Sequence, residues 1–187
     1  VTPSSHFFPH DISNFSLNHT LFQNEPHFHH LGTTEAYIST SRGCIYNCAF
    51  CGSARSMNLD TPVRERSVDS VKSEISQLLR LHPSLDSIRV SDDLFLKNKE
   101  SISRAVDIFS TFSVTWRAMA HILSIYHLSD DKLRQLYDSG CLELFIGIES
   151  GSPRILKMIH KTSDLQIIRS SVKRILDMGI HVKGFFI

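Results

Sequence analysis

The sequence lacks an excess of charge of either sign and has no long apolar run. Its 187 residues include 20 Lys and Arg against 19 Asp and Glu, which gives a formal net charge of +1. Such an even balance provides no global electrostatic field for a nucleic acid or an anionic membrane, and no apolar segment approaches the length of a membrane span. We therefore expect no nucleic-acid or membrane partner, which leaves a small molecule or a peptide as the class of substrate.

A secretion signal is also absent, because the first residues contain neither a basic segment nor a hydrophobic one. We therefore expect a cytoplasmic protein. Cysteine is scarce as well, and three of the four cysteines fall within residues 44–51. In a chain without a secretion signal this distribution does not indicate the disulfide framework of a small extracellular domain. Metal binding is the better interpretation.

The chain divides by composition near residue 31. Residues 1–31 hold three of the six prolines and six of the eleven histidines without a sustained helical or strand period, which predicts a lead-in or linker. From 32–187, short β-prone segments alternate with amphipathic ones, which predicts one core domain of βα units around a parallel sheet. The expected strands are residues 35–40, 86–91, 113–119, 142–148 and 180–187.

Helical crossovers are expected between these strands, because each gap has a polar capping residue followed by an apolar stripe. About five βα steps result. Parallel strands with right-handed crossovers can form an open doubly wound sheet or a barrel, and we favour an incomplete (β/α) barrel within the α/β class. Because the chain opens on Val1 and stops inside the last expected strand, we interpret it as a fragment. Five helices are expected: one capped by Ser67, one near 98–110, one that begins at Ser129, a short one that opens on Ser152-Pro153, and one that begins after Asp164.

The motif C-x3-C-x2-C, formed by Cys44, Cys48 and Cys51, directly follows the first expected strand. Catalytic groups gather at the carboxyl ends of parallel strands in both candidate topologies, so the motif lies at the expected active face. Soft thiolate ligands suit iron–sulfur clusters, and three of them can bind three irons of a [4Fe–4S] cubane. The fourth iron would then have no cysteine ligand.

A structural zinc site is the alternative. Zinc takes four ligands, often from C-x2-C pairs completed by another Cys or His, so Cys141 or a histidine would have to supply the fourth. The C-x3-C spacing is unusual for such sites, and Cys141 precedes the fourth strand, at the opposite face of a barrel. The non-enzymatic alternative is therefore a zinc-stabilised α/β binding domain.

The cysteine motif, with aromatic Phe50 just before Cys51, resembles the signature of the radical S-adenosylmethionine (SAM) superfamily. The resemblance extends over about residues 35–187 and is closest to cobalamin-associated members and their methylthiotransferase relatives. It implies a [4Fe–4S] cluster with SAM on the open iron, and a reduced ferredoxin or flavodoxin as electron donor. A 5'-deoxyadenosyl radical then abstracts hydrogen from the substrate. Further matching segments are 64–67, 90–93, 116–118 and 147–152, with Lys161 beyond them.

The resemblance also implies cofactor-binding residues at other strand ends. Asp92 and Asp93 lie where the family commonly has a Gly-Gly-Glu-like segment that receives the amino group of SAM, although the residue type differs here. Either Asp could instead form an Asx turn or a helix cap. Glu149 and Ser150 match positions that contact the ribose or methionyl part of SAM.

Three more candidate residues complete the expected cofactor site. Arg117 could bind a carboxylate bidentately. Lys161 follows Glu149 where relatives place a basic side chain near the SAM carboxylate, and a solvated helix face is its alternative. Phe50 is expected to shield the cluster or to line the adenine site. The histidine-rich residues 27–30 are assigned no function.

The subclass is open between two alternatives. A methylthiotransferase should carry further cluster-binding cysteines upstream, and a cobalamin enzyme should carry an upstream binding domain. Residues 1–43 contain neither. We prefer a cobalamin-linked methyltransferase or related modification enzyme, with cobalamin held by a domain outside this chain.

Overall fold

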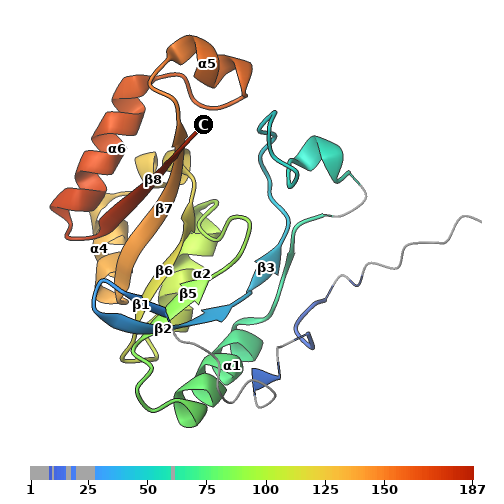
Figure 1. Ribbon diagram of the computed structural model, residues 1–187, viewed down its shortest axis with the longest axis vertical. Coiled ribbons are helices and arrows are strands. Elements are labelled where there is room, and N and C mark those ends of the chain that lie inside the picture. The colour runs from blue at the N-terminus through green and yellow to red at the C-terminus, as the bar shows by residue number, and fades with distance from the viewer. Residues whose placement is uncertain (1–8, 10, 16–17, 20–27, 60–61) are drawn as a thin grey trace, which may run out of the picture.

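The computed structural model describes residues 9, 11–15, 18–19, 28–59 and 62–187. Its centre is a six-stranded sheet in the order β1-β2-β5-β6-β7-β8 (Figure 1). All neighbouring pairs from β2 to β8 are parallel, which confirms the expected α/β architecture. The strands are β1 Phe28–His30, β2 Thr33–Ile38, β5 Ser87–Val90, β6 Thr115–Ala120, β7 Cys141–Glu149 and β8 His181–Phe186.

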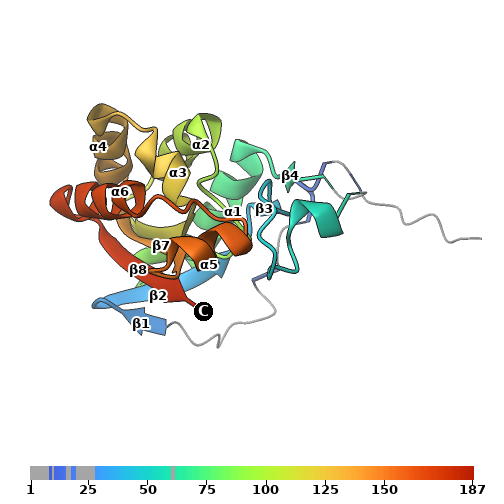
Figure 2. The ribbon, with the colours of Figure 1, turned by 90° about the horizontal axis from the view of Figure 1, so that it is seen from above.

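Helices follow the parallel strands, and α1, α2, α4 and α6 lie on one face of the sheet (Figure 2). Three expected caps are confirmed: the side chains of Ser67, Ser129 and Asp164 accept hydrogen bonds from backbone N–H groups in the first turns of α1, α4 and α6. None of the helices in the described residues is long and apolar enough to cross a membrane. The helices are α1 Val68–Leu81, α2 Lys99–Phe109, α3 Ile122–Tyr126, α4 Asp130–Asp138, α5 Pro153–Met158 and α6 Leu165–Asp177.

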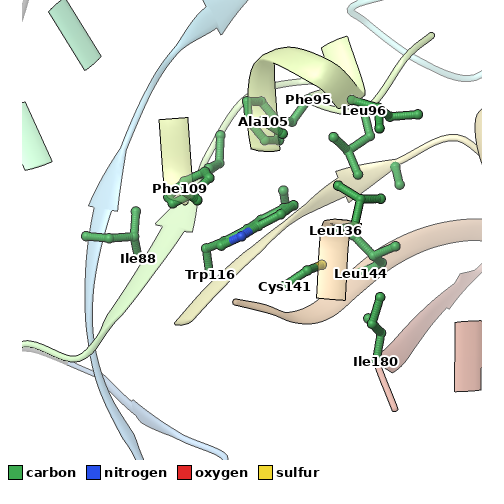
Figure 3. Close-up of a cluster of buried hydrophobic side chains, with 14 of the residues drawn as sticks. Ile88, Phe95, Leu96, Ala105, Phe109, Trp116, Leu136, Cys141, Leu144 and Ile180 are labelled. Carbon is green, nitrogen blue, oxygen red and sulfur yellow. The ribbon is translucent and has the colours of Figure 1, made fainter. Parts of the chain in front are cut away.

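The main core lies between the sheet and these helices and is built around Trp116 (Figure 3). The indole is fully buried and stacks on Phe109 with ring centroids 4.8 Å apart, while Phe95 meets it edge-on at 5.9 Å. Its ring N–H donates to the backbone oxygen of Ser139 at 3.0 Å. The tryptophan therefore joins β6 to α2 and to the end of α4, with its one polar atom satisfied.

Two features of the fold were not expected. Residues 28–30, which we had placed in the lead-in, form the edge strand β1, which pairs antiparallel with β2. The connecting residues Leu31 and Gly32 both have positive φ, of 51° and 80°, as a two-residue hairpin turn requires. The second feature is a small antiparallel pair of β3 Ser41–Arg42 with β4 Arg64–Glu65. Both ladders are short, so neither has enough alternating residues to produce a strand pattern.

The sheet has two edges within the described part of the chain, β1 and β8, and does not close into a barrel. Because β2, β5, β6, β7 and β8 are parallel, their carboxyl ends meet at one edge of the sheet. At this edge β3 leads the chain out into the loop that carries the cysteine motif (Figure 1). The fold therefore places the motif where side chains from several strand ends can reach it.

We predict that Trp116→Ala lowers the free energy of unfolding by about 3–5 kcal/mol, since it removes a fully buried aromatic side chain. Urea unfolding followed by far-ultraviolet circular dichroism measures this, because Trp116 is the only tryptophan and its fluorescence is lost in the variant. Leu176→Ala is the control, since Leu176 is 53% exposed on α6. Equal destabilisation by the two changes would show that the aromatic stack contributes little.

Candidate cysteine-cluster site

The three cysteines lie on the loop between β3 and a short 3-10 helix at Arg55–Met57. All three are half-buried and none is in a disulfide. Two tight turns shape the motif, because the Cys51 N–H donates to the Cys48 oxygen at 3.1 Å and the Ala54 N–H to the Cys51 oxygen at 3.0 Å. Cys141, by contrast, is buried at the amino end of β7. As expected, it lies at the opposite edge of the sheet from the triplet.

The thiols influence one another electrostatically. Burial raises the pKa of Cys44, and negative charge on Cys48, Cys51 or Asp93 raises it further. Burial also raises the pKa of Cys48, while the ammonium of Lys161 lowers it. The thiolate is the form that binds metals, so metal binding at this loop must displace protons.

Asp92 holds the segment from which the cysteine loop begins. Its buried carboxylate accepts three hydrogen bonds, from the Thr40 N–H at 2.6 Å, the Thr40 hydroxyl at 2.7 Å and the Ser41 hydroxyl at 2.7 Å. Both carboxylate oxygens are therefore engaged by the segment that joins β2 to β3. This arrangement favours a positioning role for Asp92 over the expected contact with the SAM amino group.

Asp93 joins the two ends of the loop. Its carboxylate accepts from the Gly43 N–H at 2.9 Å and from the Ser53 hydroxyl at 2.7 Å. Asp93 is itself exposed. The two neighbouring aspartates thus hold the cysteine loop against the carboxyl end of β5, through partners that precede them by at least 40 residues.

The end of α5 supports the loop from the other side. The Ala49 N–H donates to the Ile159 oxygen at 3.1 Å, and the His160 ring nitrogen Nδ1 lies 3.1 Å from the Asn47 oxygen. The Asn47 side chain in turn accepts from the Ser56 N–H at 3.2 Å. Sequence reasoning missed both Asn47 and His160, because a lone Asn and a lone His carry no motif. The middle of the loop is therefore fixed to the segment that follows β7.

Glu149 and Lys161 lie next to the triplet, as a pair. Their charged groups are 3.5 Å apart, and both side chains are largely buried. Glu149 has a positive φ of 63°, which is uncommon for a residue with a side chain. Its carboxylate folds back over Gly147, where a Cβ would overlap the carboxylate. The chain therefore turns sharply at the end of β7 and brings a carboxylate and an ammonium to the edge where the cysteines lie.

Ser150 follows Glu149, and its hydroxyl accepts from the Ser152 N–H at 3.2 Å. The side chain of Phe50, within the loop, is 48% exposed. Both residues are thus placed at the carboxyl edge of the sheet as expected. Whether they touch a cofactor stays a prediction.

Arg117 lies within β6 rather than at its exit. Its guanidinium binds the Glu35 carboxylate through two hydrogen bonds of 2.5 Å and the Glu143 carboxylate through one of 2.8 Å. The bidentate carboxylate partner that we expected is therefore a residue of this chain. These ion pairs give Arg117 a role within the sheet, and its expected contact with a cofactor stays a prediction.

A further residue of the site, His121, caps α3 directly after β6. Its ring stacks on Tyr46 of the cysteine loop, with centroids 3.6 Å apart and planes 15° from parallel. Burial, together with the ammonium of Lys161, lowers the pKa of His121 from 6.5 to about 3. His121 is therefore a neutral imidazole that packs against the cysteine loop through its stack on Tyr46. The sequence indicated its place at the strand exit but not the stack.

The residues present fit an iron–sulfur cluster in their donor chemistry. The triplet supplies three soft sulfur ligands on one partly exposed loop. Within the described ranges, no group of three or more Cys, His, Asp and Glu side chains is arranged around the position of a single metal ion. The zinc alternative thus has no preformed four-ligand site there, while a cubane would distribute the three cysteines over three irons.

Known proteins resemble this chain in sequence and in fold. An uncharacterised methyltransferase of Pyrococcus horikoshii is 32% identical over an alignment of 161 residues, and the match covers 83% of this chain and 33% of the relative. Cytidylyl-2-hydroxyethylphosphonate methyltransferase of Streptomyces wedmorensis is 28% identical over 84% of this chain and 29% of its own length. The chain thus spans about a third of the length of the curated relatives that it matches.

A solved structure, that of the cobalamin-dependent SAM radical enzyme OxsB with aqua-cobalamin and SAM bound, has a TM-score of 0.68. At 22% identity, over 81% of this chain and 23% of OxsB, this likeness is one of fold. Together with the open parallel sheet of the described residues, it confirms the expected α/β fold of the partial-barrel type. The family model of the Radical SAM superfamily matches residues 38–187, from the end of β2 through β8. With the cysteine loop at the carboxyl edge of a parallel sheet, this match shows that the chain belongs to the Radical SAM superfamily.

Proposed function

We propose that this chain forms part of a radical SAM enzyme in which Cys44, Cys48 and Cys51 bind three irons of a [4Fe–4S] cluster. One observation carries the proposal: the loop of three unpaired, half-buried cysteines is fixed to the carboxyl edge of the sheet, beside a carboxylate–ammonium pair. A cluster bound there, with SAM on its fourth iron, would supply the electron that breaks the sulfonium bond and yields a 5'-deoxyadenosyl radical. The chain's own residues bind, orient and protect these groups.

Lys161 and Glu149 are the residues that we assign to SAM. The ammonium of Lys161 can pair with the SAM carboxylate, and the Glu149 carboxylate can accept from an amino or ribose hydroxyl group. Ser150 adds a hydroxyl at the same strand end. We assign to Phe50, which is exposed on the loop, the cover of the cluster or of the adenine ring. Asp92 and Asp93 act through the loop that they hold, as positioning residues.

A reduced ferredoxin or flavodoxin is the proposed electron donor, since the cysteine loop is partly exposed. For the subclass we propose a cobalamin-linked methyltransferase or related modification enzyme that acts on a small molecule or a peptide. The similarity to two methyltransferases and the fold of a cobalamin-dependent enzyme support this choice. A methylthiotransferase is the second candidate. Assays of the purified full-length protein for bound cobalamin and for a second iron–sulfur cluster distinguish the cobalamin-linked enzyme from the methylthiotransferase.

We predict that Cys44→Ala, Cys48→Ala and Cys51→Ala each abolish cluster assembly, while Cys141→Ala retains it, because Cys141 lies at the opposite edge of the sheet. Anaerobic reconstitution with iron and sulfide, followed by metal analysis and electron paramagnetic resonance with and without SAM, measures this. Normal loading of the three loop variants would overturn the assignment. Stoichiometric zinc in place of iron in the parent protein would favour the binding-domain alternative.

The second prediction concerns the support of the loop. Asp92→Ala should lower the free energy of unfolding by about 2–4 kcal/mol, because three buried donors lose an ionised partner, and should also lower the iron content after reconstitution. Asp131→Ala, in the exposed first turn of α4, is the matched control. If Asp92→Ala keeps full stability and iron content but loses SAM binding, Asp92 contacts the cofactor as first expected.

The third prediction separates SAM binding from cluster binding. Glu149→Gln and Lys161→Gln should each weaken SAM binding roughly ten- to a hundredfold, the effect of losing one charge-assisted hydrogen bond, without loss of iron. Calorimetric titration of cluster-loaded protein under anaerobic conditions measures the affinity. Lys157→Gln, an exposed lysine on α5, is the control. Unchanged affinity in both variants would limit the pair to a structural role.

A further inference from the structure

The face of the sheet opposite α1, α2, α4 and α6 is charged, and we call it the inner face. Its side chains alternate along the strands with Ile88, Trp116 and Leu144, which belong to the helix-covered core. Strand register places the inner-face residues in successive rows toward the carboxyl edge. One row contains Tyr37, Arg89, Arg117 and Glu143, the next contains Met119, Phe145 and Lys183, and the row after it contains Gly147.

The cations of the inner face differ in their partners. Arg117 is bound by Glu35 and Glu143, as described above. Arg89, in the same row, contacts two aromatic rings, with its guanidinium carbon 5.3 Å from the centre of Tyr37 and 4.8 Å from that of Phe145. The guanidinium carbon of Arg117 lies 5.2 Å from the centre of the same Phe145 ring. No carboxylate of the described residues lies within ion-pair distance of Arg89, although the side chain is only half-exposed.

Lys183 approaches the same phenyl ring from the neighbouring strand β8. Its ammonium lies 5.9 Å from the centre of the Phe145 ring and, like Arg89, pairs with none of the carboxylates in the described ranges. Lys183 is exposed. Three cations on separate strands therefore surround one buried aromatic ring, Phe145, and within the described ranges only Arg117 among them has carboxylate partners.

Among the described residues of the two rows that hold Arg89 and Lys183, even with Glu35 counted, the charges do not balance. Arg89, Arg117 and Lys183 contribute three positive charges, whereas Glu35 and Glu143 contribute two negative ones, and both carboxylates are used by Arg117. Contact with an aromatic ring compensates the desolvation of a cation only in part. An arginine fork and a lysine over a buried aromatic ring, neither with a carboxylate partner among the described residues, are suited to an organic anion.

We propose that Arg89 and Lys183 bind the anionic group of the substrate, a carboxylate or a phosphonate or phosphate, above the ring of Phe145. The proposal rests on the proposed function and adds the chemical class of the substrate. Phe145 precedes Glu149 by four residues in β7, a rise of roughly 13 Å along a strand. A substrate held by its anion at Phe145 thus extends along the inner face toward the cysteine loop, and its reacting carbon lies on the order of 10 Å from its charge.

The test uses cluster-loaded protein and two probes of one shape, benzoate and phenylphosphonate, with uncharged benzyl alcohol as the comparison. Calorimetric titration at low ionic strength should show binding of at least one anion and no comparable binding of benzyl alcohol. The stronger of the two anions identifies the source of the charge as a carboxylate or a phosphonate.

Arg89→Gln and Lys183→Gln should each weaken the binding of the preferred anion about tenfold or more, as expected for loss of one charge-assisted contact. Arg89→Lys, which keeps the charge without the fork, should fall between parent and Arg89→Gln. Lys173→Gln, which removes an exposed lysine of α6, should have no effect. Circular dichroism verifies that each variant is folded. If Arg89→Gln does not fold, Lys183→Gln still tests the inference, because Lys183 is exposed.

Iron content and SAM affinity are measured on the same samples. Intact cluster and SAM binding, together with anion binding that is absent or unchanged in Arg89→Gln and Lys183→Gln, would overturn the inference and leave the proposed function in place. Failure of the parent protein to assemble a cluster would overturn the proposed function instead. Equal binding of benzyl alcohol would show that recognition does not depend on a negative charge and would likewise overturn the inference.

Discussion

The position of the three cysteines depends on one buried carboxylate, that of Asp92. A buried carboxylate is costly unless its oxygens accept hydrogen bonds, and here the backbone and hydroxyl groups of Thr40 and Ser41 supply them. The interaction joins the carboxyl end of β5 to the segment that leaves β2. The parallel pairing of β2 with β5, which ends at Ile38 and Val90, therefore determines where the loop begins. Asp93 and the end of α5 fix the rest of it.

Most of the sheet and its helices were predictable, because they follow from local patterns. The period of apolar residues and caps such as Ser67 and Asp164 mark the helices regardless of what packs against them. The edge strand β1 was not predictable, since three residues carry too short a pattern and their pairing with β2 is non-local. Its turn at Leu31 and Gly32 lacks the Asn-Gly or Asp-Gly sequence that usually signals a hairpin.

The candidate site was predictable where residues act by spacing. The cysteine motif lies within eight consecutive residues, so its spacing alone predicts a metal site. Glu149 is identified by its place at a strand end. Asp92 was chosen for its place too, but its partners lie 52 and 51 residues earlier in the chain. The stack of His121 on Tyr46 likewise joins two residues that no local pattern relates. Contacts of this kind form only in the folded chain. The sequence therefore indicated the edge of the sheet at which the site lies, but not which side chains contact one another there.

Gly147 and Glu149 have a consequence for how the sequence can change. The Glu149 carboxylate occupies the space that a side chain at position 147 would need, at the place where β7 turns through a positive φ. An alanine at 147 would displace the carboxylate from Lys161, and a smaller residue at 149 would leave the glycine without a reason to persist. The two positions are therefore coupled through the ends of two flexible side chains, because a side chain at 147 fits only if the Glu149 carboxylate and the Lys161 ammonium move. The geometry of the charged pair at this strand end thus depends on the absence of a side chain two residues earlier.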